Sequence, residues 1–120
     1  MIAASAGQET AIKAKTILHG NNDANALGQL ITMAADRDHV GRSRIIRRLA
    51  KIESPLSCLA LRKIAADVGD PERVLAIRGL ATLNDQTALP LLEHIAKQAN
   101  EDRRIRDASQ KAMAKIQSRN

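Results

Sequence analysis

The sequence contains no Phe, Tyr or Trp in its 120 residues, and it has one cysteine and three prolines. Without aromatic rings, the chain cannot stack nucleic-acid bases on aromatic side chains or enclose a cation in an aromatic cage. Any hydrophobic core must consist of Leu, Ile, Val, Met and Ala. Because alanine and long charged side chains favour helices and proline is rare, this composition predicts an all-α protein.

The single cysteine, Cys58, excludes a disulfide within the chain. It has apolar neighbours, so we expect a small core residue in a reducing, cytoplasmic environment. No run of about 18 apolar residues is present, so we expect no membrane span. Residues 1–15 lack the uninterrupted apolar segment of a secretory signal.

Signatures of catalysis and of metal binding are missing from the sequence. His19, His39 and His94 are far apart, and none has Cys or carboxylates at the spacing of metal ligands. There is no HExxH, CxxC or glycine-rich phosphate loop. Glu93 is adjacent to His94, but adjacent helical residues point about 100° apart and do not pair by adjacency. We therefore predict a non-catalytic protein without a cofactor.

The sequence repeats itself at a constant interval, which separates Leu30 from Leu61 and Leu61 from Leu92. We call this interval the repeat step. One kind of segment occurs three times at this repeat step without a gap in the alignment: 26–36, 57–67 and 88–98. A second kind alternates with it, at 44–52, at 75–83 and, after a slightly longer interval, at 108–116. Two alternating kinds of helix are typical of stacked helix pairs, because one pair alone cannot bury its apolar face and stacked pairs can.

Turn and capping residues between these segments place the helix ends. Ser54 and Pro55 put a cap residue before a proline at the first helical position. Gly69, Asp70 and Pro71 end one helix and begin the next. The sequence predicts one domain over 1–120 with seven helices, at residues 8–19, 23–36, 40–52, 55–68, 71–83, 87–99 and 101–118.

The second kind of segment also carries the pattern of a known family. In DRRIRDASQKAMAKI (102–116), an aliphatic-Arg pair precedes two small residues, a small-large pair and a last aliphatic residue. GDPERVLAIRGLATL (69–83) carries the pattern through Arg73, Ala76, the Gly79-Leu80 pair and Leu83. These segments resemble HEAT-like repeats, especially the short repeats of phycobilisome lyases and of small bacterial proteins. The resemblance covers about residues 8–118 and implies a right-handed α-solenoid of about three helix pairs plus a closing helix.

Three arginines occupy equivalent positions in successive copies of the repeat: Arg42, Arg73 and Arg106. In similar proteins, such arginines pair with acids of a neighbouring turn. The acids that this resemblance suggests are Asp38, Asp70 and Asp102. We therefore interpret the three arginines as structural residues.

The positive charge of the chain is concentrated between residues 37 and 63. This segment has eight Lys or Arg and two acids, whereas the rest of the chain has eleven of each. On a helix, four of these bases form one outward stripe, with Arg37 near its end: Arg44, Arg47, Arg48 and Lys51. Most such stripes are solvated helix surfaces. This one contains no acid, which makes it a candidate for contact with an anion.

The other kind of helix supplies the expected partner-binding surface, because partners of HEAT-like proteins mostly bind the concave side. Outward-facing residues recur there, in part at the repeat step. The candidates are Ile31, Thr32, Leu59, Arg62, Lys63, Glu93, His94 and Lys97. Their mixture of charged and aliphatic side chains suits a peptide or a partner helix.

The sequence supports three hypotheses about function. The first is a bacterial-type scaffold or adaptor that recognises a protein or peptide on its concave face, while its basic stripe favours acidic segments. The alternative is contact with nucleic-acid phosphates through residues 37–51. The third, an accessory subunit of a lyase-like enzyme, follows from the family resemblance alone. The partner, the pathway and the oligomeric state leave no trace in the sequence.

Overall fold

A computed structural model of the chain describes residues 21–119 and falls into two units, residues 1–30 and 31–120. The regular elements of the described part are all helices, as the composition predicted. α1 (Asn21–Ala35) begins in the first unit and ends in the second. The helix expected at 8–19 lies outside the described residues. Within residues 21–119, no helix has both the length and the hydrophobicity needed to cross a bilayer.

The other helices belong to the second unit. They are α2 (Arg42–Leu49), α3 (Pro55–Ala66), α4 (Arg73–Thr82), the short 3-10 helix η1 (Gln86–Ala88), α5 (Leu89–Lys97) and α6 (Arg103–Ser118). α2, α4 and α6 each begin slightly later in the chain than expected. The residues just before α2 and α4 form backbone turns, in which Arg42 N–H donates to His39 and Arg73 N–H donates to Asp70.

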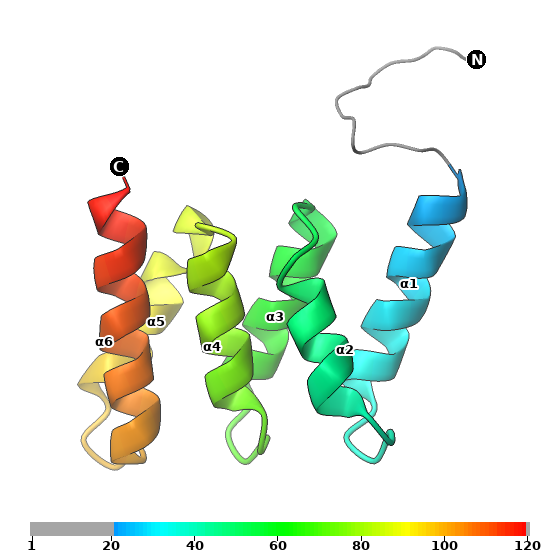
Figure 1. The fold of residues 1–120 in the computed structure, drawn as a ribbon. Coiled ribbons are helices and arrows are strands. Elements are labelled where there is room, and N and C mark those ends of the chain that lie inside the picture. The colour runs from blue at the N-terminus through cyan, green and yellow to red at the C-terminus, as the bar shows by residue number, and fades with distance from the viewer. Residues whose placement is uncertain (1–20, 120) are drawn as a thin grey trace. The chain divides into compact units, whose positions relative to one another are not determined.

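The helices of the second unit lie in two layers (Figure 1). α2, α4 and α6 stand side by side in one layer and run in the same direction, and α3 and α5 lie behind them. α4 packs against α2, α3 and α6, and α5 packs against α6. One side of the α2, α4 and α6 layer therefore faces outward.

Aliphatic side chains between the two layers form the core. The large ones without exposed surface are Ile46, Leu49, Leu61, Ile77, Leu80, Leu92 and Ile116. Because no aromatic ring fills space, small residues let the helices approach closely. At Gly79, an added Cβ would lie 3.0 Å from the Cβ of Ala50 and 3.0 Å from Cδ1 of Leu61. Glycine at this position therefore sets how closely α4 packs on its neighbours.

The backbone turns of the second unit recur at the repeat step seen in the sequence. After α1, α3 and α5, the same N–H···O bond occurs once per step: Asp36 to Met33, Asp67 to Ile64, and Gln98 to Ile95. The bond that follows recurs too: His39 to Asp36, Asp70 to Asp67, and Glu101 to Gln98. The period of the sequence is thus also a period of local structure.

Candidate functional site

Arg42 joins two successive turns of the second unit from a buried position. Its side chain is 5% exposed, and its Nε donates to the carbonyl oxygen of Ala34 at 2.7 Å. Its two terminal nitrogens donate to both carboxylate oxygens of Asp70, at 2.8 and 2.7 Å. Burial alone would raise the pKa of Asp70, but the hydrogen bonds from Arg42 and from Glu72 N–H hold this pKa below its usual value. The pair is therefore ionised at neutral pH.

Arg73 repeats this arrangement one repeat step further along the chain. It is 3% exposed, its Nε donates to the carbonyl of Ala65 at 2.9 Å, and Nη1 donates to Glu101 at 2.8 Å. The sequence had suggested Asp102 for such a pairing, whereas the structure uses Glu101 there, and Asp102 instead caps α6 by accepting from Arg104 N–H. The repeat step itself, counted from Asp70, would have selected Glu101.

The third equivalent arginine, Arg106, has no such partner. Its Nε is buried and has no hydrogen-bond acceptor in the part of the chain that the structure describes. Asp38, also suggested as a partner, is exposed and makes no ion pair with a described residue. Of the three suggested acids, only Asp70 pairs with one of these arginines.

The basic stripe lies on α2 and the turn after it. Its four residues, Arg44, Arg47, Arg48 and Lys51, are exposed, and no described carboxylate is within ion-pair distance of them. Arg37 does not join them, because its guanidinium pairs with Asp67 at the end of α3. The stripe thus consists of these four residues and carries uncompensated positive charge.

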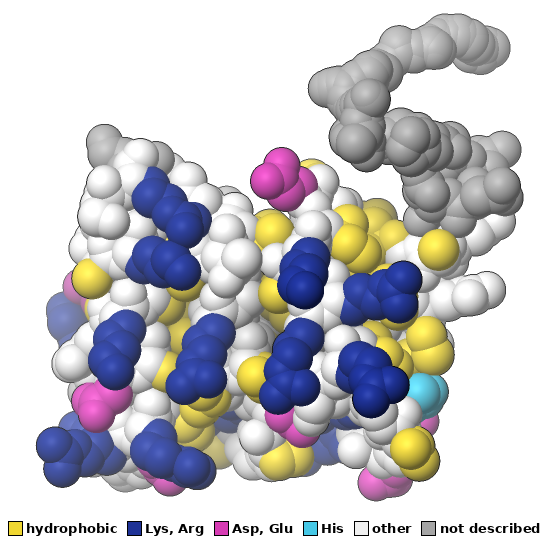
Figure 2. Space-filling model, in the orientation of Figure 1, with side chains coloured by type: hydrophobic (Ala, Val, Ile, Leu, Met, Phe, Trp, Pro, Cys, Tyr) yellow, Lys and Arg dark blue, Asp and Glu magenta, His cyan; other side chains and the backbone are white. Residues whose placement is uncertain are grey.

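Bases on α4 and α6 continue this surface. Arg78, Lys111 and Lys115 are exposed and also have no carboxylate within ion-pair distance among residues 21–119. Figure 2 shows Lys and Arg side chains gathered over α2, α4 and α6, with fewer acidic ones between them. We refer to seven residues as the basic face: Arg44, Arg47, Arg48, Lys51, Arg78, Lys111 and Lys115.

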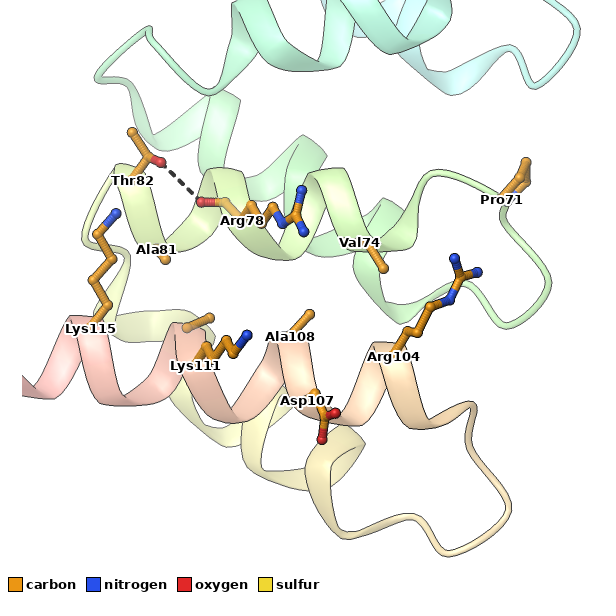
Figure 3. A pocket seen from close by; sticks show the side chains of 11 residues that line it. Pro71, Val74, Arg78, Ala81, Thr82, Arg104, Asp107, Ala108, Lys111 and Lys115 are labelled. Atoms are coloured by element: carbon orange, nitrogen blue, oxygen red, sulfur yellow. Dashed lines mark hydrogen bonds between the residues drawn. The ribbon is translucent and has the colours of Figure 1, made fainter.

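A groove of about 710 Å³ lies between α4 and α6 within the basic face (Figure 3). Its floor is apolar, because Val74, Ala108 and the almost fully buried Ala81 and Ala112 line it. Three bases of the basic face border it: Arg78, Lys111 and Lys115. The one acid that lines it, Asp107, points away from α4 in Figure 3 and lies 3.8 Å from Arg103. The groove therefore combines an apolar floor with cationic edges.

The residues expected on the partner-binding surface lie on the last part of α1, on α3 and on α5. Four of these are tied to neighbours or to each other: Arg62 to Asp85, Glu93 to Lys97, and His94 to Gln98. Leu59 is 42% exposed, and Lys63 is exposed without an ion pair to a described residue. Ile31 is half-buried and Thr32 is exposed. Much of the charge on this side is therefore compensated locally.

Two pockets that the sequence did not reveal occur on this side, and they are related by the repeat step. The first, about 210 Å³ in volume, is lined by residues that include Ala35, Arg42, Ala60, Ile64 and Asp70. The second, about 300 Å³, is lined by their equivalents Ala66, Arg73, Leu91, Ile95 and Glu101. Each pocket thus has an apolar part and a wall made by one buried arginine and its carboxylate.

Reactive groups are few in the described residues. Between positions 21 and 119, no three His, Cys, Asp or Glu side chains are grouped so that they could hold a metal ion. Cys58 is half-buried, and burial raises the pKa of its thiol, with the negative charge of Asp85 adding to the effect. The thiol is therefore protonated at neutral pH and is a poor nucleophile.

No family model matches this chain, and neither a curated protein nor a solved structure matches it. The HEAT-like character of segments 69–83 and 102–116 stays a prediction from the sequence. The structure adds to it the arginine pairs and the two pockets, each recurring after one repeat step.

Proposed function

We propose that this protein is a non-catalytic adaptor that binds an acidic segment of a partner protein on its basic face. One observation carries the proposal: the seven cations of the basic face have no carboxylate partner in residues 21–119, whereas seven of the ten other described cations do. A surface with this uncompensated charge attracts and orients an anionic partner.

The floor of the α4 and α6 groove favours a protein partner over a nucleic acid. Aliphatic side chains of a partner can cover the apolar surface around Ala81 and Ala112. A phosphate backbone has no apolar group to place there, and the chain has no aromatic ring on which a base could stack.

We further propose that the helix pairs form a HEAT-like solenoid. In a solenoid, each copy contacts chiefly its neighbours through the same set of interactions. The bonds of Arg42 and Arg73 support this, since each arginine donates both to a carbonyl oxygen of the preceding helix and to an acid of the following copy. The two recurring pockets support a further hypothesis, in which a peptide binds on the side where α3 and α5 lie.

Contact with nucleic-acid phosphates is the second candidate function. The α2 stripe favours it, because its four bases lie in a row without an acid and have further bases beside them on α4 and α6. Three neighbouring helices offer more phosphate contacts than one helix does.

Fluorescence anisotropy of a labelled Glu-rich peptide tests the proposal. We expect binding at low salt that weakens as salt rises, and Lys111→Glu should reduce the affinity by about tenfold. Lys63→Glu is the matched control, because Lys63 is equally unpaired but lies on α3. The proposal fails if the peptide does not bind at low salt or if both variants weaken binding equally.

A random-sequence DNA duplex in the same assay separates the two candidates. Tighter binding to the duplex than to the peptide, with a steep loss between about 50 and 200 mM salt, would replace the adaptor by phosphate binding.

A further inference from the structure

We propose that the groove between α4 and α6 seats a short acidic amphipathic helix of the partner, which lies along both helices. This inference rests on the proposed function and adds to it the place of contact and the form of the partner segment. Its basis is the shape of the groove, the position of its charges and the absence of a β-sheet edge from α4 and α6.

The two walls of the groove are rows of side chains one helical turn apart. Val74, Arg78 and Thr82 form the row on α4, and Ala108 and Ala112 belong to the row on α6. Most of these side chains are small, so a third helix can approach to the usual interaxial distance of about 8–10 Å. α4 and α6 run in the same direction, with Pro71 and Arg104 at one end of the groove in Figure 3. The groove therefore follows the length of both helices.

The charges at the edges match a helix with acids on both flanks. Arg78 stands on the α4 side, and Lys111 and Lys115 stand on the α6 side (Figure 3). Lys111 and Lys115 are one helical turn apart, which is about 6 Å along the helix axis. Two acids one turn apart on a partner helix have the same separation. Arg104, which is exposed and 3.9 Å from Asp102, extends the row toward the start of α6.

A helix suits this groove better than an extended peptide does. An extended chain lying on an apolar floor needs hydrogen-bond partners for its backbone, and the side-chain surfaces of α4 and α6 offer no sheet edge to supply them. A helix satisfies its backbone internally and presents one apolar stripe. That stripe would displace water from the apolar side chains that line the groove.

The test uses three labelled peptides of equal length. The first has a Leu and Ala stripe flanked by Glu, the second has Gln in place of each Glu, and the third carries a central Pro that prevents a helix. We expect the first to bind at least about tenfold more tightly than either of the others. Equal binding of the first and third peptides would overturn the helical form of the partner.

Three protein variants locate the contact. Ala108→Leu fills the groove without changing charge, and Lys111→Gln with Lys115→Gln removes two charges at its edge. Both should weaken binding of the first peptide by about tenfold. Arg47→Gln with Arg48→Gln removes two charges from α2, outside the groove, and should weaken it less than about threefold. Circular dichroism confirms that each variant is folded.

The outcomes separate this inference from the proposed function. If the α2 variant abolishes binding while Ala108→Leu has no effect, the acidic partner binds the basic face but not this groove, and the inference is wrong. If no acidic peptide binds at low salt, the adaptor proposal and the inference both fail. Amide shift changes confined to α4 and α6 on adding the first peptide would support the groove.

Discussion

At the scale of single residues, the most unusual feature is a pair of buried guanidinium groups in a small helical protein. Arg42 and Arg73 are 5% and 3% exposed. The charge on each is matched by a carboxylate, and its Nε donates to a carbonyl oxygen at the end of the preceding helix. Such pairs add little net free energy compared with apolar residues, but removing one partner leaves a buried charge uncompensated.

Replacing Arg42 by leucine should therefore strongly destabilise the protein. The change leaves the Asp70 carboxylate, which is 4% exposed, without its cation. We expect the free energy of unfolding to fall by about 3 kcal/mol, measured by urea denaturation. Arg37→Leu is the control, because Arg37 and Asp67 form an exposed pair, and it should leave the urea midpoint unchanged. Equal losses in the two variants would contradict the structural role of Arg42.

The sequence predicted which arginines recur but only one of their acids. The arginines lie within a regular helical pattern, so their equivalence follows from the period alone. The acids lie in turns, where the choice between Glu101 and Asp102 depends on how the backbone leaves α5 and enters α6. Arg106 illustrates the same limit, since its lack of an acceptor among the described residues is invisible in the pattern.

At the scale of helices, close packing depends on one glycine. Gly79 lies in the interior of α4, and its missing side chain leaves room for Ala50 and Leu61. Gly28 lies in the interior of α1, where an added Cβ would meet no atom of the described residues within 4 Å outside its own helix. The two positions thus share a backbone conformation and differ in the space around them.

Alanine at these two glycines should have opposite effects on stability. Gly28→Ala should stabilise the protein by about 0.5–1 kcal/mol through helix propensity. Gly79→Ala should destabilise it by about 1 kcal/mol, because its Cβ would press against the Cβ of Ala50, which moves only with the backbone of the turn after α2. Thermal unfolding followed by circular dichroism measures both. Stabilisation by Gly79→Ala would show that this contact is looser than the structure indicates.

The six predicted helices that fall within the described residues occur in the predicted order, but several were predicted too long at one end. α3 ends at Ala66 although the apolar pattern runs to Val68, because Asp67 is extended and Gly69 has a φ of +96°. The apolar pattern of α2 runs to Ile52, whereas the helix ends at Leu49 and continues as a turn. Periodicity locates a helix, but its last turn depends on local hydrogen bonds.

At the scale of the molecule, the basic face extends over three neighbouring helices. The sequence places the surplus between residues 37 and 63, whereas Arg78, Lys111 and Lys115 join the same face through the packing of α4 against α2 and α6. The groove was not predictable, because its two walls come from helices that are separated in the chain by α5. Period and composition predict helices and not the surface that two of them share.

Acid should unfold this protein, and more readily at low salt. Protonating thirteen carboxyls and three histidines would raise the formal net charge from +6 to +22. The folded-state pKa of Asp70 is lowered, so its stabilising effect is complete above the unfolded-state pKa of about 4 and is lost as pH falls through the folded-state value. Circular dichroism should show loss of helix at low pH, at a higher midpoint in low salt.

The variant Asp70→Asn isolates the contribution of this carboxyl to the acid response. Its free energy of unfolding should lie below that of the unmodified protein at pH 7, and the difference should shrink as pH falls below about 4. A difference that stays constant over this range would show that the ionisation of Asp70 does not contribute.

The spacing of the buried arginine pairs makes the chain extensible in whole units. Each guanidinium meets a carboxylate at the same separation along the chain, and the turns around it recur at every repeat step. If residues 67–97 were duplicated in tandem, Arg73 of the second copy would pair with Glu101. Arg73 of the first copy would pair with Asp70 of the second copy. A longer array built this way keeps a buried arginine and its carboxylate at each interior step, so its length can change by gene duplication or by design.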